Sequence, residues 1–371
     1  MRPGNKGHQK VQCLKNGEEP MKTTAGRLWP SLLLLTAVTA ARAEVYELPP
    51  EGNDVIGAVS SVVARADDTL IDIARRHGLG YEDIVRANPG VDTWLPGEGT
   101  TVVLPTRFVL PSGPRRGVVL NLAEYRMYYY PVPKAGEPPV VMTYPMSIGR
   151  MDWETPIGLT RIVSKVRNPA WYPPDSVRKE HEEEGRPLPR VVPPGPDNPL
   201  GRHAMRLGLS SGAYLIHGTN RPAGVGMQVT HGCIRMFPED IEFLFDQVGI
   251  NTEVRVINEP VKMGWDGEQL HLEVHRTLDM VPAPVDEDLD GLAIVDPATI
   301  DPARESAKAA TSEAPMRGRL TSLTVQFVAA TNSKPGELDW DFAEQLLERA
   351  DGIPARVGRT IKNAATSAAS E

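Results

Sequence analysis

The chain has no concentration of basic residues and little that could cross a membrane. Its formal net charge is −8 over 371 residues, without a basic cluster or alternating basic and aromatic residues, so nucleic acid is not an expected partner. The apolar stretch from Leu28 to Ala40 is shorter than the roughly 20 residues that a transmembrane helix needs, and nothing downstream is long enough. The sequence therefore predicts no membrane span in the mature protein.

This apolar stretch is typical of a secretory signal peptide. Lys22 and Arg27 precede it, and Ala41-Arg42-Ala43 has the small-x-small pattern of a cleavage site. We therefore predict that residues 1–43 form an N-terminal extension with a signal peptide, that the mature chain begins at Glu44, and that the protein is exported to the periplasm.

Cysteine is scarcer still. The sequence has two cysteines, and removal of the signal peptide would remove Cys13 and leave Cys233. A single thiol in an oxidising compartment cannot form an intramolecular disulfide and is exposed to oxidation, so reactivity explains its presence better than stability. The alternative is an inert, buried cysteine that serves as a small hydrophobic residue.

An imidazole from a separate element is available to this thiol. The apolar run 213–216 predicts a strand, so His217 is expected where that strand ends and a turn begins. The segment 221–226, rich in Gly and Pro, predicts a loop that returns residues 230–233 toward the same strand. A nearby imidazole lowers the pKa of a thiol and can carry its proton during acyl transfer, so the pattern predicts a His217 and Cys233 pair.

These two segments, His217-Gly218-Thr219-Asn220 and Thr230-His231-Gly232-Cys233-Ile234-Arg235-Met236, resemble the active-site signature of the L,D-transpeptidases of the YkuD family. That signature is a His, then a gap, then Ser/Thr-His-Gly-Cys followed by an apolar residue and Arg or Asn. The resemblance implies that Cys233 is the nucleophile and His217 the base. The Gly218 carbonyl would orient the imidazole as the third member of a triad.

The resemblance also implies roles for the residues around the nucleophile. Thr230, His231 and Gly232 would shape the oxyanion site, since a glycine lets the backbone approach a substrate oxygen. Arg235 would bind a substrate carboxylate, because its planar guanidinium suits bidentate pairing. On an extended segment its side chain would project to the same side as Cys233.

A zinc site is the alternative interpretation of the same residues. His217, His231 and Cys233 carry the ligand types that Zn²⁺ prefers, and three protein ligands plus water make a catalytic site. No fourth ligand cluster appears among the other histidines. The transpeptidase resemblance implies no metal and no organic cofactor.

The region before the β-rich part of the chain predicts a small strand, helix, helix, strand module over residues 60–106. It resembles a LysM peptidoglycan-binding module, although Asp67 stands where that module usually has glycine. We expect this module to contribute affinity for the polymer and not chemistry. The resemblance rests on Asp68-Thr69-Leu70, Ile73-Ala74, Asn88-Pro89, Leu95-Pro96-Gly97 and Leu104-Pro105.

Residues 115–258 predict a mainly β catalytic domain, an antiparallel β sandwich or barrel of YkuD type. Within it, the proline-rich insertion 168–201 cannot form an interior strand and resembles the capping subdomain of some members. Beyond it we expect an appended hairpin at 259–280, a linker at 281–316, a C-terminal extension with a short helix at 317–360, and a disordered tail at 361–371.

The expected function is that of a periplasmic cysteine acyltransferase acting on peptidoglycan stem tetrapeptides. Cys233 would form a thioester with the third, L-centred residue, release D-Ala, and pass the acyl group to a stem peptide, forming a 3-3 cross-link, or to a lysine of an outer-membrane lipoprotein. Two alternatives stay open. An L,D-carboxypeptidase would use water as acceptor, and a non-catalytic wall-binding protein would use the LysM module alone.

Overall fold

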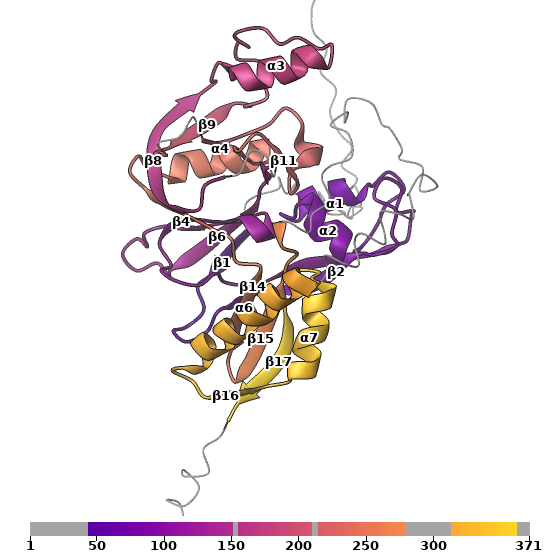
Figure 1. Cartoon of the computed structure of the whole chain (residues 1–371), viewed down its shortest axis with the longest axis vertical. Helices are drawn as coiled ribbons and strands as arrows, with labels where there is room; N and C mark the ends of the chain where they lie inside the picture. Colours follow the sequence, from indigo (N-terminus) through magenta and orange to yellow (C-terminus); the bar gives the residue numbers. More distant parts are fainter. Residues whose placement is uncertain (1–43, 151–154, 210–213, 279–312, 362–371) are drawn as a thin grey trace, which may run out of the picture. The chain divides into compact units, whose positions relative to one another are not determined.

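The computed structural model describes residues 44–150, 155–209, 214–278 and 313–361, shown in Figure 1. The predicted signal peptide, most of the predicted linker and the predicted tail beyond residue 361 lie outside this range. Of the helices that the structure describes, none combines the length and the apolar character that crossing a membrane requires.

A mostly antiparallel sheet of nine strands forms the central part of the chain, which confirms the mainly β prediction. Neighbouring strands are antiparallel except at two places, where β13 pairs with β4 and β10 pairs with β12 in parallel. In spatial order the strands are β1 (Glu44–Glu47), β6 (Val140–Pro145), β5 (Arg126–Tyr130), β4 (Gly117–Asn121), β13 (Glu253–Ile257), β8 (Gly158–Arg167), β9 (His203–Leu207), β10 (Leu215–His217) and β12 (Ile234–Arg235).

Short elements complete this central part of the chain. The strands β7 (Ile148–Gly149) and β11 (Gln228–Thr230) form a separate parallel pair beside β12. The 3-10 turns are η1 (Leu122–Glu124) and η2 (Pro222–Gly224). The helix α4 (Pro238–Gln247) starts with proline and two acids, which favour a helix N-terminus, and buries Ile241 and Leu244 in the core on one face of the sheet.

The strands β4, β5 and β6 are buried on both faces, so their sequences are mostly apolar at successive positions. Successive side chains point to opposite faces of a sheet. Accordingly, Val118 and Met127 join the core on the α4 side, whereas Val119 and Tyr128 join a second core. The second core also contains Leu70 and other side chains of the N-terminal module.

This N-terminal module has the predicted strand, helix, helix, strand order. It consists of β2 (Val55–Val63), α1 (Leu70–Arg76), α2 (Tyr81–Ala87) and β3 (Thr101–Val109), with β2 and β3 antiparallel. Thr69 begins α1 with a capping box, in which its hydroxyl accepts from Asp72 N and Asp72 accepts from Thr69 N. The strands extend beyond the expected bounds of 60–106 at both ends.

The predicted hairpin and the C-terminal extension form one structure. The hairpin is β14 (Val261–Asp266) and β15 (Gln269–Val274), and it belongs to a four-stranded sheet in the order β14-β15-β17-β16, with β17 (Ala355–Thr360) and β16 (Gly336–Leu338). Helices α6 (Glu313–Thr331) and α7 (Trp340–Arg349) supply Leu323, Leu346 and Leu347 to its core. The hairpin thus pairs with the C-terminal extension through β15 and β17, and α6 begins at Glu313, among the residues expected as linker.

The proline-rich insertion is ordered by one buried asparagine. The Asn198 side chain donates to the carbonyls of Pro169, Val192 and Pro193 and accepts from Leu200 N. Proline has no backbone N–H, so the Asn198 amide supplies hydrogen-bond donors that this proline-rich segment lacks. The insertion contains α3 (Asp175–Glu183).

Candidate active site

The parallel pair β10 and β12 brings the two halves of the signature together. Ile216 pairs with Ile234 and His217 with Arg235, and both isoleucines are fully buried in the core. Because paired residues share a face of a sheet and successive residues alternate, His217 and Arg235 lie together on the opposite face. Cys233 directly precedes β12, and its thiol is hydrogen-bonded by the backbone of Leu215, the first residue of β10. The base candidate therefore lies at the end of β10, and the nucleophile candidate directly precedes the adjacent strand β12.

His217 has a defined tautomer. The side chain is buried, and its Nδ1 lies 2.6 Å from the Gly218 carbonyl oxygen. A carbonyl can only accept, so Nδ1 carries the hydrogen and Nε2 keeps a free lone pair. Burial, together with the positive charge of Arg235, lowers the pKa of His217 to about 3. The ring is therefore a neutral base near neutral pH.

Cys233 is a neutral thiol in the resting site. Burial raises the pKa of Cys233 above the ordinary cysteine value, and the Leu215 backbone and the Arg235 charge offset this only in part. The lowered thiol pKa that the sequence suggested is therefore not found. Both groups are therefore neutral in the resting site, in place of an imidazolium and a thiolate.

Two threonine hydroxyls fix the backbone around the nucleophile. Thr155 Oγ1 donates to the Gly232 carbonyl at 3.0 Å, and Thr230 Oγ1 donates to the Cys233 carbonyl at 2.5 Å. Gly232 has a φ of +89°, which residues with a side chain rarely adopt. In a trans peptide the carbonyl and the following N–H point in opposite directions, so Cys233 N–H points away from Thr155. The sequence indicated Thr230 and Gly232 but gave no signal for Thr155, which contacts the site only through tertiary structure.

His231 is turned toward the insertion. Its Nε2 lies 2.9 Å from Glu180 Oε2 on α3 and 3.1 Å from Arg150 Nη2, and Arg150 also donates to Glu180 Oε1 at 2.8 Å. Neither Glu180 nor Arg150 stood out in the sequence, because a single charge in a loop or in a charged helix is ordinary there. The three side chains link α3 to the segment that carries Cys233.

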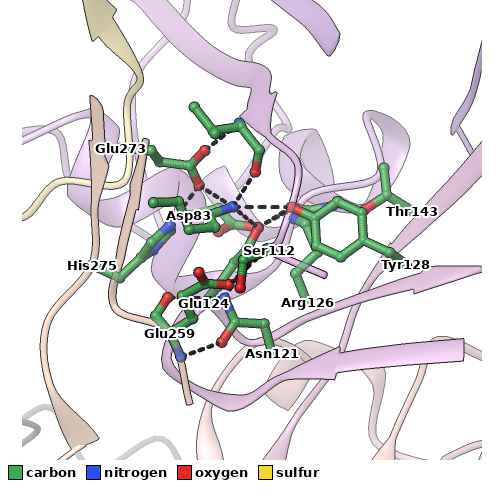
Figure 2. A network of polar contacts seen from close by, with 12 residues as sticks. Asp83, Ser112, Asn121, Glu124, Arg126, Tyr128, Thr143, Glu259, Glu273 and His275 are labelled. Atoms are coloured by element: carbon green, nitrogen blue, oxygen red, sulfur yellow. Dashed lines mark hydrogen bonds and ion pairs between the residues drawn. The ribbon is translucent and has the colours of Figure 1, made fainter. Parts of the chain in front are cut away.

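The zinc interpretation gains no support from this geometry, since His231 is paired with Glu180. Within the described residues, the group with metal-binding geometry is elsewhere: Glu124, Glu273 and His275, whose ligand atoms lie within 4.8 Å of one another. Figure 2 shows these three side chains converging in a buried polar network. Lys262 Nζ already lies 2.8 Å from both carboxylates, so an ammonium group occupies this position.

Arg235 contributes positive charge directly beside the nucleophile. Its backbone exchanges hydrogen bonds with Ser147, at 3.1 Å from Arg235 N and 2.8 Å to Arg235 O. Its guanidinium lies close to Gly224, because a Cβ built on that glycine would be 3.7 Å from Arg235 Nη1. The half-buried side chain therefore lies between the nucleophile and the loop 222–230.

Comparison with known proteins agrees with this site. A family model described as the YkuD L,D-transpeptidase catalytic domain matches residues 115–256. The chain is similar to the probable L,D-transpeptidase YcfS of Escherichia coli K12, with 38% identity over 78% of this chain and 89% of that protein. It is also similar to the probable L,D-transpeptidase ErfK/SrfK of Salmonella typhimurium, with 36% identity over 84% and 90% of the two chains. It is similar as well to the probable L,D-transpeptidase YbiS of Escherichia coli K12, with 39% identity over 66% of this chain and 79% of that protein.

Proposed function

Because the chain belongs to the L,D-transpeptidase family, we propose that it is a periplasmic cysteine acyltransferase that acts on peptidoglycan stem tetrapeptides. The observation that supports the proposal is the pairing of β10 with β12, which sets His217 opposite Arg235, two residues after Cys233. Cys233 would be the nucleophile, His217 the neutral base and Arg235 the cation, and these are the groups that acyl transfer from a charged peptide needs.

In the proposed reaction, Cys233 attacks the carbonyl carbon of the L-centred third residue. His217 Nε2 takes the thiol proton as the carbon–sulfur bond forms, because a separate thiolate is unfavourable at this buried position. The tetrahedral oxyanion would be stabilised by backbone N–H groups near residues 232 and 233. When the peptide bond breaks, His217 gives its proton to the leaving D-Ala amine, and a thioester remains on Cys233.

In the second half of the reaction an acceptor amine attacks the thioester carbonyl and the C–S bond breaks, while His217 takes the proton that the amine loses and returns it to the Cys233 sulfur. The acceptor is a second stem peptide, which gives a 3-3 cross-link, or a lysine of an outer-membrane lipoprotein. Arg235 holds the donor through a bidentate pair with a stem carboxylate, which keeps the scissile carbonyl near the sulfur. The N-terminal module, with its LysM resemblance, supplies contact with the glycan.

The test is to incubate the mature protein with purified muropeptides and to identify products by mass spectrometry. We expect cross-linked or amine-linked products, and a thioester adduct on Cys233 when tetrapeptide donor is supplied alone. Cys233→Ala should give neither product nor adduct while its circular dichroism spectrum stays that of the wild type. Trimmed stems without any transfer product would instead establish a carboxypeptidase, and full activity of the folded Ala variant would remove Cys233 from the mechanism.

A further inference from the structure

The N-terminal module contacts the loop that separates the base from the nucleophile. Tyr81 N, at the start of α2, donates to Val225 O at 2.9 Å, and Glu82 N lies 3.4 Å from Gly226 O. The backbones meet at two glycines: a Cβ on Gly80 would lie 2.8 Å from Gly226 Cα. This contact leaves no room for any side chain on either residue.

The same loop is connected to Arg235 through one residue. Gly224 O accepts a hydrogen bond from Ser147 Oγ at 2.7 Å, and the Ser147 backbone pairs with that of Arg235. A displacement of Gly226 is therefore transmitted along a short path of hydrogen bonds to the strand that follows Cys233.

A second connection reaches the helix that follows the nucleophile. Arg75 on α1 makes a bidentate ion pair with Glu239 in the first turn of α4, with Nε–Oε1 and Nη2–Oε2 distances of 2.7 and 2.8 Å. Its guanidinium also lies over the Phe237 ring, 5.4 Å from the centroid. Two parallel hydrogen bonds between the guanidinium and the carboxylate fix the relative orientation of these groups as well as their distance, which a single hydrogen bond does not.

From these contacts we propose that the N-terminal module is a positioning element of the catalytic centre. The start of α2 fixes loop 222–230 and Arg75 fixes the start of α4, so the module holds both ends of the segment that contains Cys233 and Arg235. In this proposal Gly80 and Arg75 are positioning residues, which act through loop 222–230 and through α4. The module would therefore affect the rate of acyl transfer even from soluble donors, in addition to any contact that it makes with the polymer.

Two substitutions within the module test the proposal. Gly80→Ala places a methyl group against Gly226, while Gly90→Ala is its control, since a Cβ at Gly90 meets nothing within 4 Å. Arg75→Met removes the ion pair with Glu239, and Arg76→Met is its control, because Arg76 pairs with Asp68 inside the module. Arg75→Lys keeps the charge without the bidentate geometry.

Two readouts are measured on the full mature chain. The first is the rate at which iodoacetamide alkylates Cys233, which needs no peptidoglycan and so is independent of the proposed function. The second is kcat and KM with a soluble tetrapeptide. Gly80→Ala and Arg75→Met should change the alkylation rate and lower kcat by roughly tenfold, since small misplacements of reacting groups cost up to 10²-fold, with KM little changed. Arg75→Lys should recover part of the loss, and both controls should resemble the wild type.

Wild-type alkylation and kcat in folded Gly80→Ala and Arg75→Met would overturn the proposal. If Gly80→Ala fails to fold, Arg75→Met decides alone, because its half-exposed side chain can be removed without opening the core. A loss confined to binding of insoluble sacculi, with soluble kinetics intact, would also overturn it. Absence of any transfer product together with altered alkylation would leave the positioning role supported and the proposed function refuted.

Discussion

The hydrogen bond to the Gly218 carbonyl sets the tautomer of His217, and thereby which ring nitrogen can act as the base. By accepting from Nδ1 it leaves Nε2 unprotonated, and burial keeps the ring neutral. The same burial raises the pKa of Cys233. The site therefore holds its proton on sulfur in the resting state, and a protonated thiol is less prone to oxidation than a thiolate.

This arrangement predicts a particular pH dependence for alkylation of Cys233. A raised thiol pKa means that less thiolate is present at any given pH, so the rate should keep rising beyond about pH 8.5, where an ordinary cysteine is half ionised. An imidazolium and thiolate pair would instead give a plateau that extends to acidic pH. The measurement is the alkylation rate by intact mass across the pH range, and a plateau below neutral pH would contradict the neutral pair.

Arg235 is expected to act through geometry as well as charge. Arg235→Lys should lower kcat/KM for a tetrapeptide donor by roughly tenfold to a hundredfold, because a hydrogen bond to a charged group contributes about 1.5–3 kcal/mol. The exposed Arg221, in the loop between the two motifs, gives a matched control as Arg221→Lys. Equal kinetics of the two variants would remove Arg235 from the binding site, and efficient use of pentapeptides ending in D-Ala-D-Ala would contradict the L,D assignment.

Among the elements, α3 is the one whose role the sequence left open. Its Glu180 joins it to His231 and Arg150, beside the nucleophile segment. Glu180→Gln should lower kcat a few-fold and speed proteolysis within 168–201, because part-exposed ion pairs contribute up to about 1 kcal/mol. Glu183→Gln, on the exposed side of the same helix, is the control. If both variants behave alike, the insertion is held by other contacts, such as those of Asn198.

Elements with a local signal could be predicted from the sequence, and those made by distant contacts could not. The apolar run before His217 predicted the strand that ends there, and the Gly and Pro residues of 221–226 predicted the loop that leads back toward Cys233. The helix α6 was missed because Pro315 and Gly318 both argue against helix, although proline is tolerated in a first turn. The strand β17 has a weak pattern, ARVGRT, and is stabilised by pairing with β15, far away in the sequence. The Gly80–Gly226 contact leaves no trace in either segment alone.

For the whole molecule, the second core changes what truncation should do. If the N-terminal module contributed only affinity for the polymer, as expected from the sequence, a chain beginning at Gly117 would keep its activity on soluble donors. However, such a chain would expose the apolar face formed by Val119 and Tyr128, and it would remove the Asp83 carboxylate that pairs with fully buried Arg126 at 2.6 Å. We expect this chain to aggregate or unfold, as judged by solubility and thermal melting. A soluble, cooperatively melting and active product would refute this expectation.

The buried network in Figure 2 should stabilise the junction of the three parts of the chain. Lys262 on β14 donates to Val109 O at the end of β3 and pairs with Glu124 after β4 and Glu273 on β15. Lys262→Met leaves two buried carboxylates without their cation, so the free energy of unfolding should fall by about 3–5 kcal/mol. Lys179→Met, at an exposed site, is the control in thermal or urea unfolding. An unchanged midpoint for Lys262→Met would show that the network is energetically neutral.

The parallel pairing of β4 with β13 also sets an order of events during folding. The strand Gly117–Asn121 can form its hydrogen bonds with Glu253–Ile257 only after that later segment has been synthesised. In the same way, β15 can pair with Ala355–Thr360 only after that segment has been synthesised. Contacts between such distant segments carry a large loop-closure cost and slow the search for the native state. During synthesis, the edges of β4 and β15 therefore stay unpaired until their partners β13 and β17 have been made. In that interval the nascent chain is prone to aggregate.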